Sequence, residues 1–475
     1  MKTKRIFLAF MAMLAFTACN NEVFEASNEK NEGEVKEKGY FVLNVTNPPT
    51  TRTSGDETDR GTTEESEINS LMVVFTDESG NIVSISTPSF TNGVTEKFQV
   101  ALGTYDVYAI INQPDEVVVT VGDNIEQVIK VAEAIDAISG FKGGSFLMVN
   151  KRHNDADKAG VTLTINSSHS ISNPAEAFIY VDRVACKIVD ATEAVSNLKQ
   201  LEIATGGVIK NVEVKGIVVL NVNKQFNLIQ TWNQLNASGI PLDTKVLSTP
   251  LFTGTSQDLI AEQYFNNIGE FTTIQQDVDG KIIGIVDETV GDGFYSKNPV
   301  YTTENRPTII ANGGDLTAGR GETTGVIYKV QAKDNNSIMS TFYTFKNVFY
   351  TDIDDINALQ EFDGIDLNDL SIPSLRALGI KVYEDGVMYY TYFIRDPNAN
   401  YRYDTKDYYG VFRNSTYKLA INTISSLGDD VPGGAIVDPT KPGEPGNPPI
   451  DTEETYIQVS VVVNRWILNT LSIDF

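Results

Sequence analysis

The sequence has few of the residues that form disulfide frameworks or hydrolytic sites. Its 475 residues include two cysteines, Cys19 and Cys186, and two histidines, His153 and His169. One cysteine near the N-terminus and one far from it cannot form an internal disulfide framework, so burial and strand pairing must hold the fold together. Neither histidine has the surroundings of a buried general base, because Ser168-His169 has the composition of a polar turn. We therefore do not expect an enzyme.

Positive charge is also scarce. The formal net charge is −26, and no cluster of lysine and arginine follows the first few residues. Because a phosphate backbone is bound by a basic surface, nucleic acid is excluded as a partner. No segment after the N-terminus has the length and apolar character of a membrane span. The hydrophobic fraction of 41% fits a globular chain with room for about two or three domains.

Cofactor and metal sites are not expected. Gly319-Arg320-Gly321 lacks the lysine, strand and helix of a phosphate-binding loop. Cys186 lies in an apolar run and is expected to be a small buried side chain. Six aspartates lack the glycine and terminal glutamate of a calcium loop, and indicate a solvated acidic face. They are Asp352, Asp354, Asp355, Asp363, Asp366 and Asp369.

The N-terminus has the pattern of an export signal. Residues 1–18 combine basic residues with a short apolar core, and Phe16-Thr17-Ala18-Cys19 resembles a bacterial lipobox. The resemblance implies cleavage before Cys19, lipidation of its thiol, and export to the periplasm and then the outer membrane. The alternative is an ordinary signal peptide with an incidental cysteine. Residues 19–39 are rich in Asn, Glu and Lys and predict a flexible spacer.

The rest of the chain predicts short strands separated by turns. Tyr40–Val45 alternates, with Phe41, Leu43 and Val45 on one face, and it ends at Asn47-Pro48-Pro49. Strands are also expected at 71–75, 82–85, 117–121, 211–222, 387–394 and 415–424, and one helix at Asp123–Ser139. Strands at short intervals favour β-sandwiches over α/β units.

An exposed segment follows the first of these strands. Residues 50–67 contain almost no apolar side chains, but they include Arg52 and Arg60. Isolated basic residues in an extended, unstructured segment are what a trypsin-like protease cleaves. The two arginines could equally be ordinary loop residues of a protein that keeps its first strand.

The C-terminal tail, 456–475, is a long apolar strand pattern. At 3.3 Å per residue it would extend about 66 Å, so it must bend or reach beyond its own domain. Residues 431–455 before it are rich in proline and glycine and predict a solvated tether. We expect the acceptor sheet to belong to another copy of the protein. Trp466 is expected to be a buried plug at that interface rather than an exposed aromatic. The apolar positions are Ile457, Val459, Val461, Val463, Ile467, Leu471, Ile473 and Phe475, interrupted by Arg465 and Asn469.

Taken together, these segments resemble the fimbrillins, the major stalk subunits of the type V pili of Bacteroidia-class bacteria, and in particular the short-fimbria branch. The resemblance extends from end to end, and no single motif in it is highly specific. It depends on Cys19, Tyr40–Val45 with Arg52, Thr63–Phe75, Val181–Ile188, Gly325–Ala332, Phe412–Leu419 and Val459–Phe475 with Trp466.

The resemblance implies a mainly β fold of two transthyretin-like antiparallel β-sandwich domains with a few short helices and a donor-strand tail. It implies removal of the first strand by an Arg-specific protease, with Arg52 as the cleavage residue and Arg60 as the runner-up, followed by head-to-tail polymerisation with other copies. Anchor and tip subunits would be further partners. The expected divisions are 1–18, 19–39, 40–52 (the released strand), 53–178 and 179–430 (the two sandwiches), 431–455 and 456–475.

The function expected from these features is that of a structural stalk subunit of a surface fimbria that supports adhesion or biofilm formation. An anchor or tip subunit, or a monomeric surface lipoprotein that binds glycan or peptide, is the alternative.

Overall fold

A computed structural model describes most of the chain between Glu37 and Ile467. In several strands, β2 (Thr58–Arg60) and β35 (Ile457–Ile467) among them, it describes the backbone alone. The described residues are 37–46, 58–115, 117–131, 145–151, 158–192, 197–198, 201–202, 208–220, 225–233, 246–248, 275–276, 282–283, 300–304, 309–312, 315–318, 324–334, 337–396, 408–424, 426–430 and 457–467.

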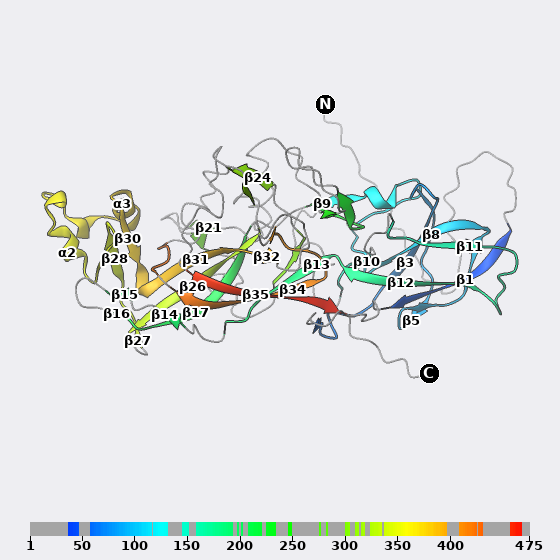
Figure 1. The fold of residues 1–475 in the computed structure, drawn as a ribbon, viewed down its shortest axis with the longest axis horizontal. Helices are drawn as coiled ribbons and strands as arrows, with labels where there is room; N and C mark the ends of the chain where they lie inside the picture. Colours follow the sequence, from blue (N-terminus) through cyan, green and yellow to red (C-terminus); the bar gives the residue numbers. More distant parts are fainter. Residues whose placement is uncertain are drawn as a thin grey trace, which may run out of the picture. The chain divides into compact units, whose positions relative to one another are not determined.

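The fold is mainly β, as the sequence predicted (Figure 1). The helices of the described part are short, and none of them has the length and apolar character needed to cross a bilayer. They are α2 (Ile353–Asn357), α3 (Ile372–Ala377) and the 3-10 turns η1 (Ile125–Gln127), η4 (Gln360–Phe362), η5 (Leu367–Asp369) and η6 (Glu384–Gly386).

The first sheet contains the N-terminal strand. Its order is β4-β3-β8-β10-β12-β1-β6-β5, with β11 paired to β8 and β7 paired to β1. Most pairs are antiparallel, but β1 runs parallel to β12. Its strands are β1 (Lys38–Thr46), β3 (Leu71–Thr76), β4 (Ile82–Ser86), β5 (Phe90–Thr91), β6 (Val94–Thr95), β7 (Phe98–Ala101), β8 (Gly103–Ile111), β10 (Met148–Asn150), β11 (Val161–Ile165) and β12 (Ala175–Arg183).

The second sheet contains the C-terminal strand. Its order is β2-β35-β34-β13-β23, and β14 pairs with β34. The pairs β13 with β34 and β2 with β35 are parallel. Besides β2 and β35, its strands are β13 (Ala185–Asp190), β14 (Asn197–Leu198), β23 (Val300–Thr303) and β34 (Ser415–Ile424).

The remaining strands form smaller sheets. The largest has the order β17-β26-β27 with β31 on β26, and another has the order β29-β28-β30. Their strands are β17 (Asn211–Leu220), β26 (Gly325–Asp334), β27 (Ser337–Ile338), β28 (Phe342–Phe345), β29 (Val348–Tyr350), β30 (Ile380–Tyr383) and β31 (Val387–Phe393). The two-stranded pairs are β9 (Ile129–Val131) with β18 (Gln225–Asn227), β15 (Leu201–Glu202) with β16 (Val208–Ile209), β19 (Thr231–Asn233) with β20 (Val246–Ser248), β21 (Gln275–Gln276) with β22 (Ile282–Ile283), β24 (Ile309–Asn312) with β25 (Asp315–Ala318), and β32 (Arg395–Asp396) with β33 (Tyr408–Tyr409).

The hairpin of β3 and β4 shows how local sequence sets this fold. The Asp77 carboxylate accepts hydrogen bonds from the backbone N–H groups of Ser79 and Asn81, both at 2.9 Å. Gly80 follows with φ +84°, a conformation that glycine adopts without steric cost. The apolar residues before and after this turn then pair as antiparallel strands, which confirms the predicted hairpin.

Two predictions between the strands were wrong. Residues 123–131 do not begin a helix, because Asn124 caps the short turn η1 and Ile129–Val131 then pairs as β9 with β18; most of the expected helix beyond Val131 lies outside the described residues. Val117–Val121 forms no strand, and the side chains of Val118 and Val121 are exposed. In both places the prediction used the spacing of apolar residues alone, whereas contacts with residues distant in sequence determine the local structure.

The change from the first sheet to the second occurs at Val184. Strand β12 continues through residue 178, where the boundary between the two sandwich domains was expected, and pairs with β1 and β10 up to Arg183. The division into two such domains stays a prediction, whereas the sheet pairing places β12 wholly with the N-terminal strands.

Candidate functional site

Strand β1 occupies an interior position in the first sheet. One edge pairs in parallel with β12 from Phe41 to Thr46, and the other pairs antiparallel with β7 and β6. Its ends are also held, since Tyr40 N–H donates to the His169 carbonyl at 3.0 Å and Val45 N–H donates to the Gly93 carbonyl at 2.9 Å. The predicted N-terminal strand is therefore a fully integrated part of this sheet, where Figure 1 shows it in dark blue.

The apolar side chains of β1 fill the core beneath that sheet. Phe41 and Leu43 are 0% exposed, and Val45 packs half-buried against the same core cluster. The Phe41 ring meets the rings of Phe75 and Phe98 edge-on, each with a centroid separation of 5.4 Å. Without β1, this aromatic cluster and the facing edges of β12 and β7 would be open to solvent.

Strand β35 pairs with the same chain. It runs antiparallel to β34 along residues 457–465, and its last residues pair with Thr58–Arg60 of β2 (Figure 1). The expectation that the tail has no acceptor in its own chain was therefore wrong for residues 457–467. Within the part of the chain that the structure describes, β35 pairs on both edges at its end alone, where the three residues of β2 lie beside it.

The register of this pairing preserves the predicted alternation. The odd-numbered positions 459, 461 and 463 stand opposite Ile421, Leu419 and Tyr417, which are all buried residues of β34. Successive side chains of a strand point to opposite faces of the sheet, so the odd-numbered residues share one face and the even-numbered residues the other. The odd-numbered face of the tail thus corresponds to the buried face of β34.

A buried polar network holds the segment that follows β2. Glu65 is 2% exposed; its carboxylate accepts from Tyr301 Oη at 2.5 Å and forms an ion pair with Lys187 Nζ at 2.8 Å. Burial acts to raise the pKa of Glu65, but hydrogen bonds from Lys187, Tyr301 and Thr62 outweigh it, so the pKa is lowered. The segment 50–67 was expected to be exposed and unstructured, and this was wrong for Thr58–Arg60, which pair as β2, and for Glu65, which is buried and anchored.

Arg183 connects that segment to the start of β34. Its Nε donates to the Glu65 carbonyl at 2.7 Å, Nη2 to Ser66 Oγ at 3.1 Å, and Nη1 to Asn414 Oδ1 at 3.3 Å. Asn414 in turn donates to Asp182 Oδ1 at 2.6 Å. Burial lowers the pKa of Arg183 to about 10, which leaves the guanidinium charged at neutral pH. The junction between β12 and β13 is thus fixed against the segment after β2 and the start of β34.

A second buried cation lies next to this network. Arg413 forms an ion pair with Glu304, with 2.5 Å between Nη2 and Oε1, and it donates to the carbonyls of Leu228 and Asn227 at 3.0 and 2.7 Å. All its partners are acceptors, so the pair satisfies the condition for burying a charge. Arg183 and Arg413 lie in segments that carry the family resemblance, but the sequence pattern did not predict this role for either side chain. An arginine within or next to an apolar run was the available signal.

Several predicted site residues lie outside the described residues: Cys19, Arg52, Leu471, Ile473 and Phe475. Of the six aspartates between 352 and 369, Asp352 and Asp366 cap α2 and η5 through their side chains. Within the described residues, no group of three or more His, Cys, Asp or Glu is arranged to hold a metal ion. His169 accepts a hydrogen bond from the Asn166 backbone at 3.1 Å in an exposed turn.

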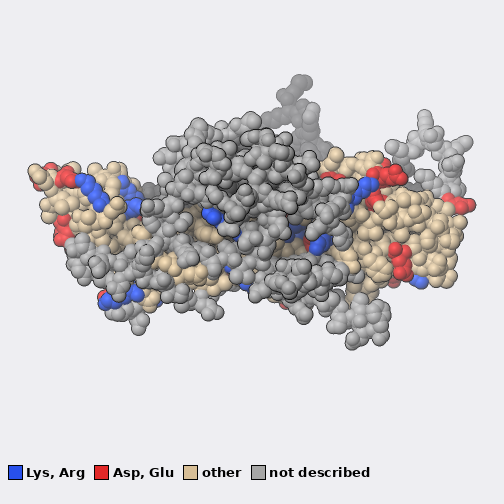
Figure 2. All heavy atoms as spheres, in the orientation of Figure 1, with Lys and Arg blue, Asp and Glu red and all other residues tan. Residues whose placement is uncertain are grey.

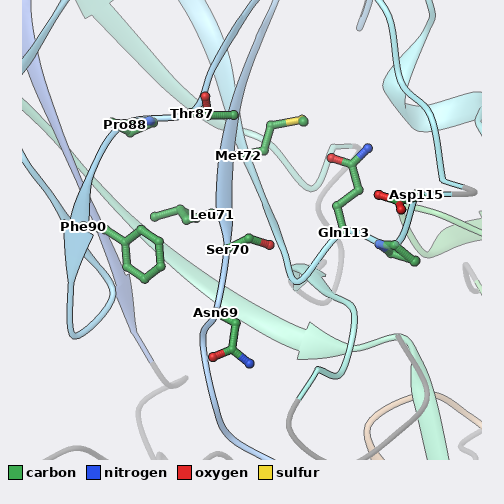
Figure 3. A pocket seen from close by; sticks show the side chains of 10 residues that line it. Asn69, Ser70, Leu71, Met72, Thr87, Pro88, Phe90, Gln113 and Asp115 are labelled. Atoms are coloured by element: carbon green, nitrogen blue, oxygen red, sulfur yellow. The ribbon is translucent and has the colours of Figure 1, made fainter. Parts of the chain in front are cut away.

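One cavity of about 510 Å³ lies at the start of β3. It is bordered by Asn69–Met72, Thr87–Pro88, Phe90 and Gln113–Asp115. Figure 3 shows Leu71 and Phe90 on one side of β3, and Gln113 and Asp115 on the other. The Gln113 amide already donates to the Val117 carbonyl. The cavity offers a mixed lining without a cluster of ionisable groups.

The charged side chains of the described surface are dispersed. On the face in Figure 2, blue and red groups are small and separate, and no continuous basic area appears among the described residues.

Comparison with known proteins identifies the C-terminal part of the chain. Residues 381–471 match the family described as "Major fimbrial subunit protein type IV, Fimbrillin, C-terminal", and this range contains β31, β34 and β35. No curated protein matches the sequence. The family is one of fimbrial structural proteins, which suggests a non-enzymatic role.

Among solved structures, the fold is similar to a candidate cell adhesion protein from Parabacteroides distasonis (13% identity, 90% of this chain and 96% of that chain, TM-score 0.43). It is also similar to a fimbrilin, FimA, from Porphyromonas gingivalis (13% identity, 90% and 98%, TM-score 0.39). The tip fimbrial protein Mfa3 from P. gingivalis is a third (13% identity, 90% and 100%, TM-score 0.34). The match over residues 381–471 shows that this part of the chain is similar to the C-terminal region of the fimbrillins, in agreement with the resemblance found in the sequence.

Proposed function

We propose that the protein is the stalk subunit of a surface fimbria and polymerises by strand exchange. The observation that carries the proposal is the interior position of β1, whose neighbours on both edges would be left unpaired by its removal. A protease cuts the segment after β1, the strand leaves, and the C-terminal tail of a second copy takes its place. The contact between copies is head-to-tail and does not close, so it extends into a filament.

The vacated β1 position has the properties of a strand acceptor. It presents the open edges of β12 and β7 and an apolar floor formed by Phe75, Phe98 and neighbouring residues. An incoming strand regains both ladders of backbone hydrogen bonds and buries apolar side chains on one face. The odd-numbered face of the tail supplies those side chains.

The tail can leave its own chain at modest cost. Among the described residues of the uncut protein, β2 covers the second edge of β35 at residues 465–467 and no other strand pairs with that edge. Strand exchange gives the backbone groups of the tail a ladder of similar length on another copy, while the edge of β34 that the tail leaves is opened. The intrachain pairing therefore describes the state before assembly.

Arg52 is the proposed cleavage residue, with Arg60 as runner-up. The backbone of Arg60 lies in β2 and pairs with Ile467. A protease binds its substrate as an extended, unpaired segment, so cutting after Arg60 requires β2 to leave β35 first. Cutting after Arg52 does not, and it leaves β2 and its anchored continuation on the mature subunit.

Before maturation, the lipid on Cys19 holds the precursor at the outer membrane, and loss of residues 19–52 releases the subunit into the fimbria at the cell surface. An Arg-specific protease, anchor and tip subunits, and other copies of the chain are the partners. The filament supports adhesion or biofilm formation.

Deleting residues 456–475 tests the proposal. Processed full-length protein should form heat-labile ladders on denaturing gels, whereas the deletion variant should give soluble monomers. A point variant sharpens the test: Val461→Asp charges the apolar face of the tail and should reduce polymer yield at least tenfold, while Ser460→Asp on the other face should not. Polymers that persist in the deletion variant would overturn the proposal.

The pairing of β35 with β34 favours one other candidate, a monomeric surface lipoprotein that keeps its first strand. The protein on isolated outer membranes distinguishes the two. The stalk predicts an N-terminus at Thr53 and a ladder, and the monomer predicts a single lipidated band that begins at Cys19.

A further inference from the structure

Strand β12 carries an exposed aromatic side chain beside β1. Burial alternates along this strand: Ala175, Ala177 and Ile179 are buried, and Phe178 is 55% exposed. The parallel register pairs Phe178 with Asn44 of β1. The neighbour of Phe178 on this outer face is therefore set by whichever strand occupies the β1 position.

Odd- and even-numbered residues of the tail point to opposite faces of the sheet, so only one of the two sets reaches the outer face that carries Phe178. Phe41, Leu43 and Val45 point into the core cluster, and Asn44 has the opposite parity. If the odd-numbered tail residues take the three core positions, the even-numbered ones lie on the Phe178 side. Within 457–467 the even-numbered residues are Gln458, Ser460, Val462, Asn464 and Trp466.

One register of the incoming tail places an apolar residue at each of the three core positions of β1 and places all the odd-numbered valines of the tail in the core. Val459, Val461 and Val463 would replace Phe41, Leu43 and Val45, with the strand running in the same direction as β1. A shift of two residues toward the C-terminus would put Arg465 in the core. A shift of two the other way would leave Val463 beyond the last core position and place Ser460 beside Phe178. The first register places Val462 opposite Phe178.

We infer that Phe178, on the outer face of the sheet, contacts the incoming tail of a second copy and pairs with its Val462. This inference rests on the proposed function. In the uncut chain Val462 stands opposite Lys418. Exchange therefore replaces a charged neighbour with an aromatic one, and an aromatic and a β-branched residue form a favourable cross-strand pair. This pair stabilises the tail when it is bound to another copy, relative to the tail paired with β34 of its own chain. It also determines the register of the bound tail.

Cysteine cross-linking of assembled filaments tests the register. Phe178→Cys is combined with cysteine at 458, 460, 461, 462 or 463 in the full chain, which is processed and then oxidised. Background is low, because Cys19 leaves with the released segment and Cys186 is buried, with a pKa raised by that burial. The inference predicts intersubunit disulfides that are strongest at 462 and absent at 461 and 463.

The outcomes separate this inference from the proposed function. Normal filaments that cross-link best at 458 or 460, at an odd-numbered position, or nowhere, overturn the Phe178–Val462 pair and leave strand exchange intact. Failure of the unmodified chain to polymerise instead overturns the proposed function. As a second measurement, Phe178→Ser should speed filament dissociation by about 1.4- to 5-fold, the range expected for one cross-strand pair. The matched control Ile171→Ser, at a side chain 60% exposed in the turn before β12, should leave the rate unchanged.

Discussion

Strands β1 and β35 lie near opposite ends of the chain and are held in different ways. Strand β1 is paired on both edges and places Phe41 and Leu43 at 0% exposure in the core of the first sheet. Strand β35 is paired along one edge with β34, and on the other edge the described residues cover three of its positions, through β2. The segment that follows β2 is anchored separately, by the polar network around Glu65 and Arg183.

The difference shows which strand can leave unaided. Removing β1 from an intact chain requires two ladders and a core to open together, whereas β35 can peel from a single ladder after β2 detaches. A covalent cut changes this balance, because it makes β1 a separate peptide that is lost by dilution. We therefore expect the protease to control assembly, and the tail to respond to it.

The largest effect is expected from blocking the cut. The double variant Arg52→Ala, Arg60→Ala should keep β1 in place and give no ladder after protease treatment, because the acceptor position stays filled. Arg60→Ala alone should still assemble. Gel analysis of protein from outer membranes measures both, and polymers built from the uncut double variant would show that β1 need not leave.

Shortening Phe41 tests how tightly β1 is held. Phe41→Ala should lower the unfolding free energy of the uncut precursor by about 3–5 kcal/mol, since a large core side chain leaves a cavity. Val45→Ala, at a half-buried position, should cost about 1 kcal/mol. Urea denaturation measures both. After processing, assembled filaments of the two variants should match wild type; a lasting difference would mean that β1 is retained.

The stability contributed by Glu65, which anchors the segment after β2, should depend on pH. The folded pKa of Glu65 is lowered from its ordinary value of 4.5, so its carboxylate contributes stability above that value and loses it as the pH falls through the folded pKa. Glu65→Gln should destabilise the precursor by about 1–3 kcal/mol at pH 7, because Lys187 and Tyr301 lose a charged partner.

Thermal unfolding from pH 7 to pH 3 checks this expectation. The melting temperatures of wild type and Glu65→Gln should converge as the pH falls through the lowered pKa of Glu65, since both side chains become neutral there. Glu67→Gln, a neighbouring variant without these contacts, is the control. A constant difference at all pH values would contradict the assigned role of the charge.

The smallest effect concerns β2. Asp59→Pro removes a backbone donor and should weaken the pairing of Thr58–Arg60 with residues 465–467 by about 1 kcal/mol. Hydrogen exchange at 465–467 should become several-fold faster, and exchange at 459–463 should not change. Thr50→Pro serves as the control, and equal protection in both variants would mean that β2 does not cover the tail.

The sequence predicted the strands well where alternation and burial agree. Strand β34 spans Ser415–Ile424 as expected, and the hairpin of β3 and β4 follows from Asp77 and Gly80. It failed at Val117–Val121 and Ile129–Val131, where apolar spacing was ambiguous and distant residues decided the outcome.

The pairing of the tail and the polar network could not be predicted, because both depend on residues far apart in sequence. Arg183 and Asn414 are separated by 231 positions, and Glu65 meets Tyr301 across 236. An arginine in an apolar run indicates that a partner exists, but only the sheet topology shows which one. The parity of the tail, by contrast, was correct and holds in the register with β34.

N-terminal sequencing of subunits from heat-labile filaments on the cell surface shows whether β1 is removed before assembly. If strand exchange builds the filament, those subunits begin at Thr53, or at Gly61 if Arg60 is used, and lack Phe41, Leu43 and Val45. Filament subunits that still begin at the lipidated Cys19 and retain β1 would contradict it.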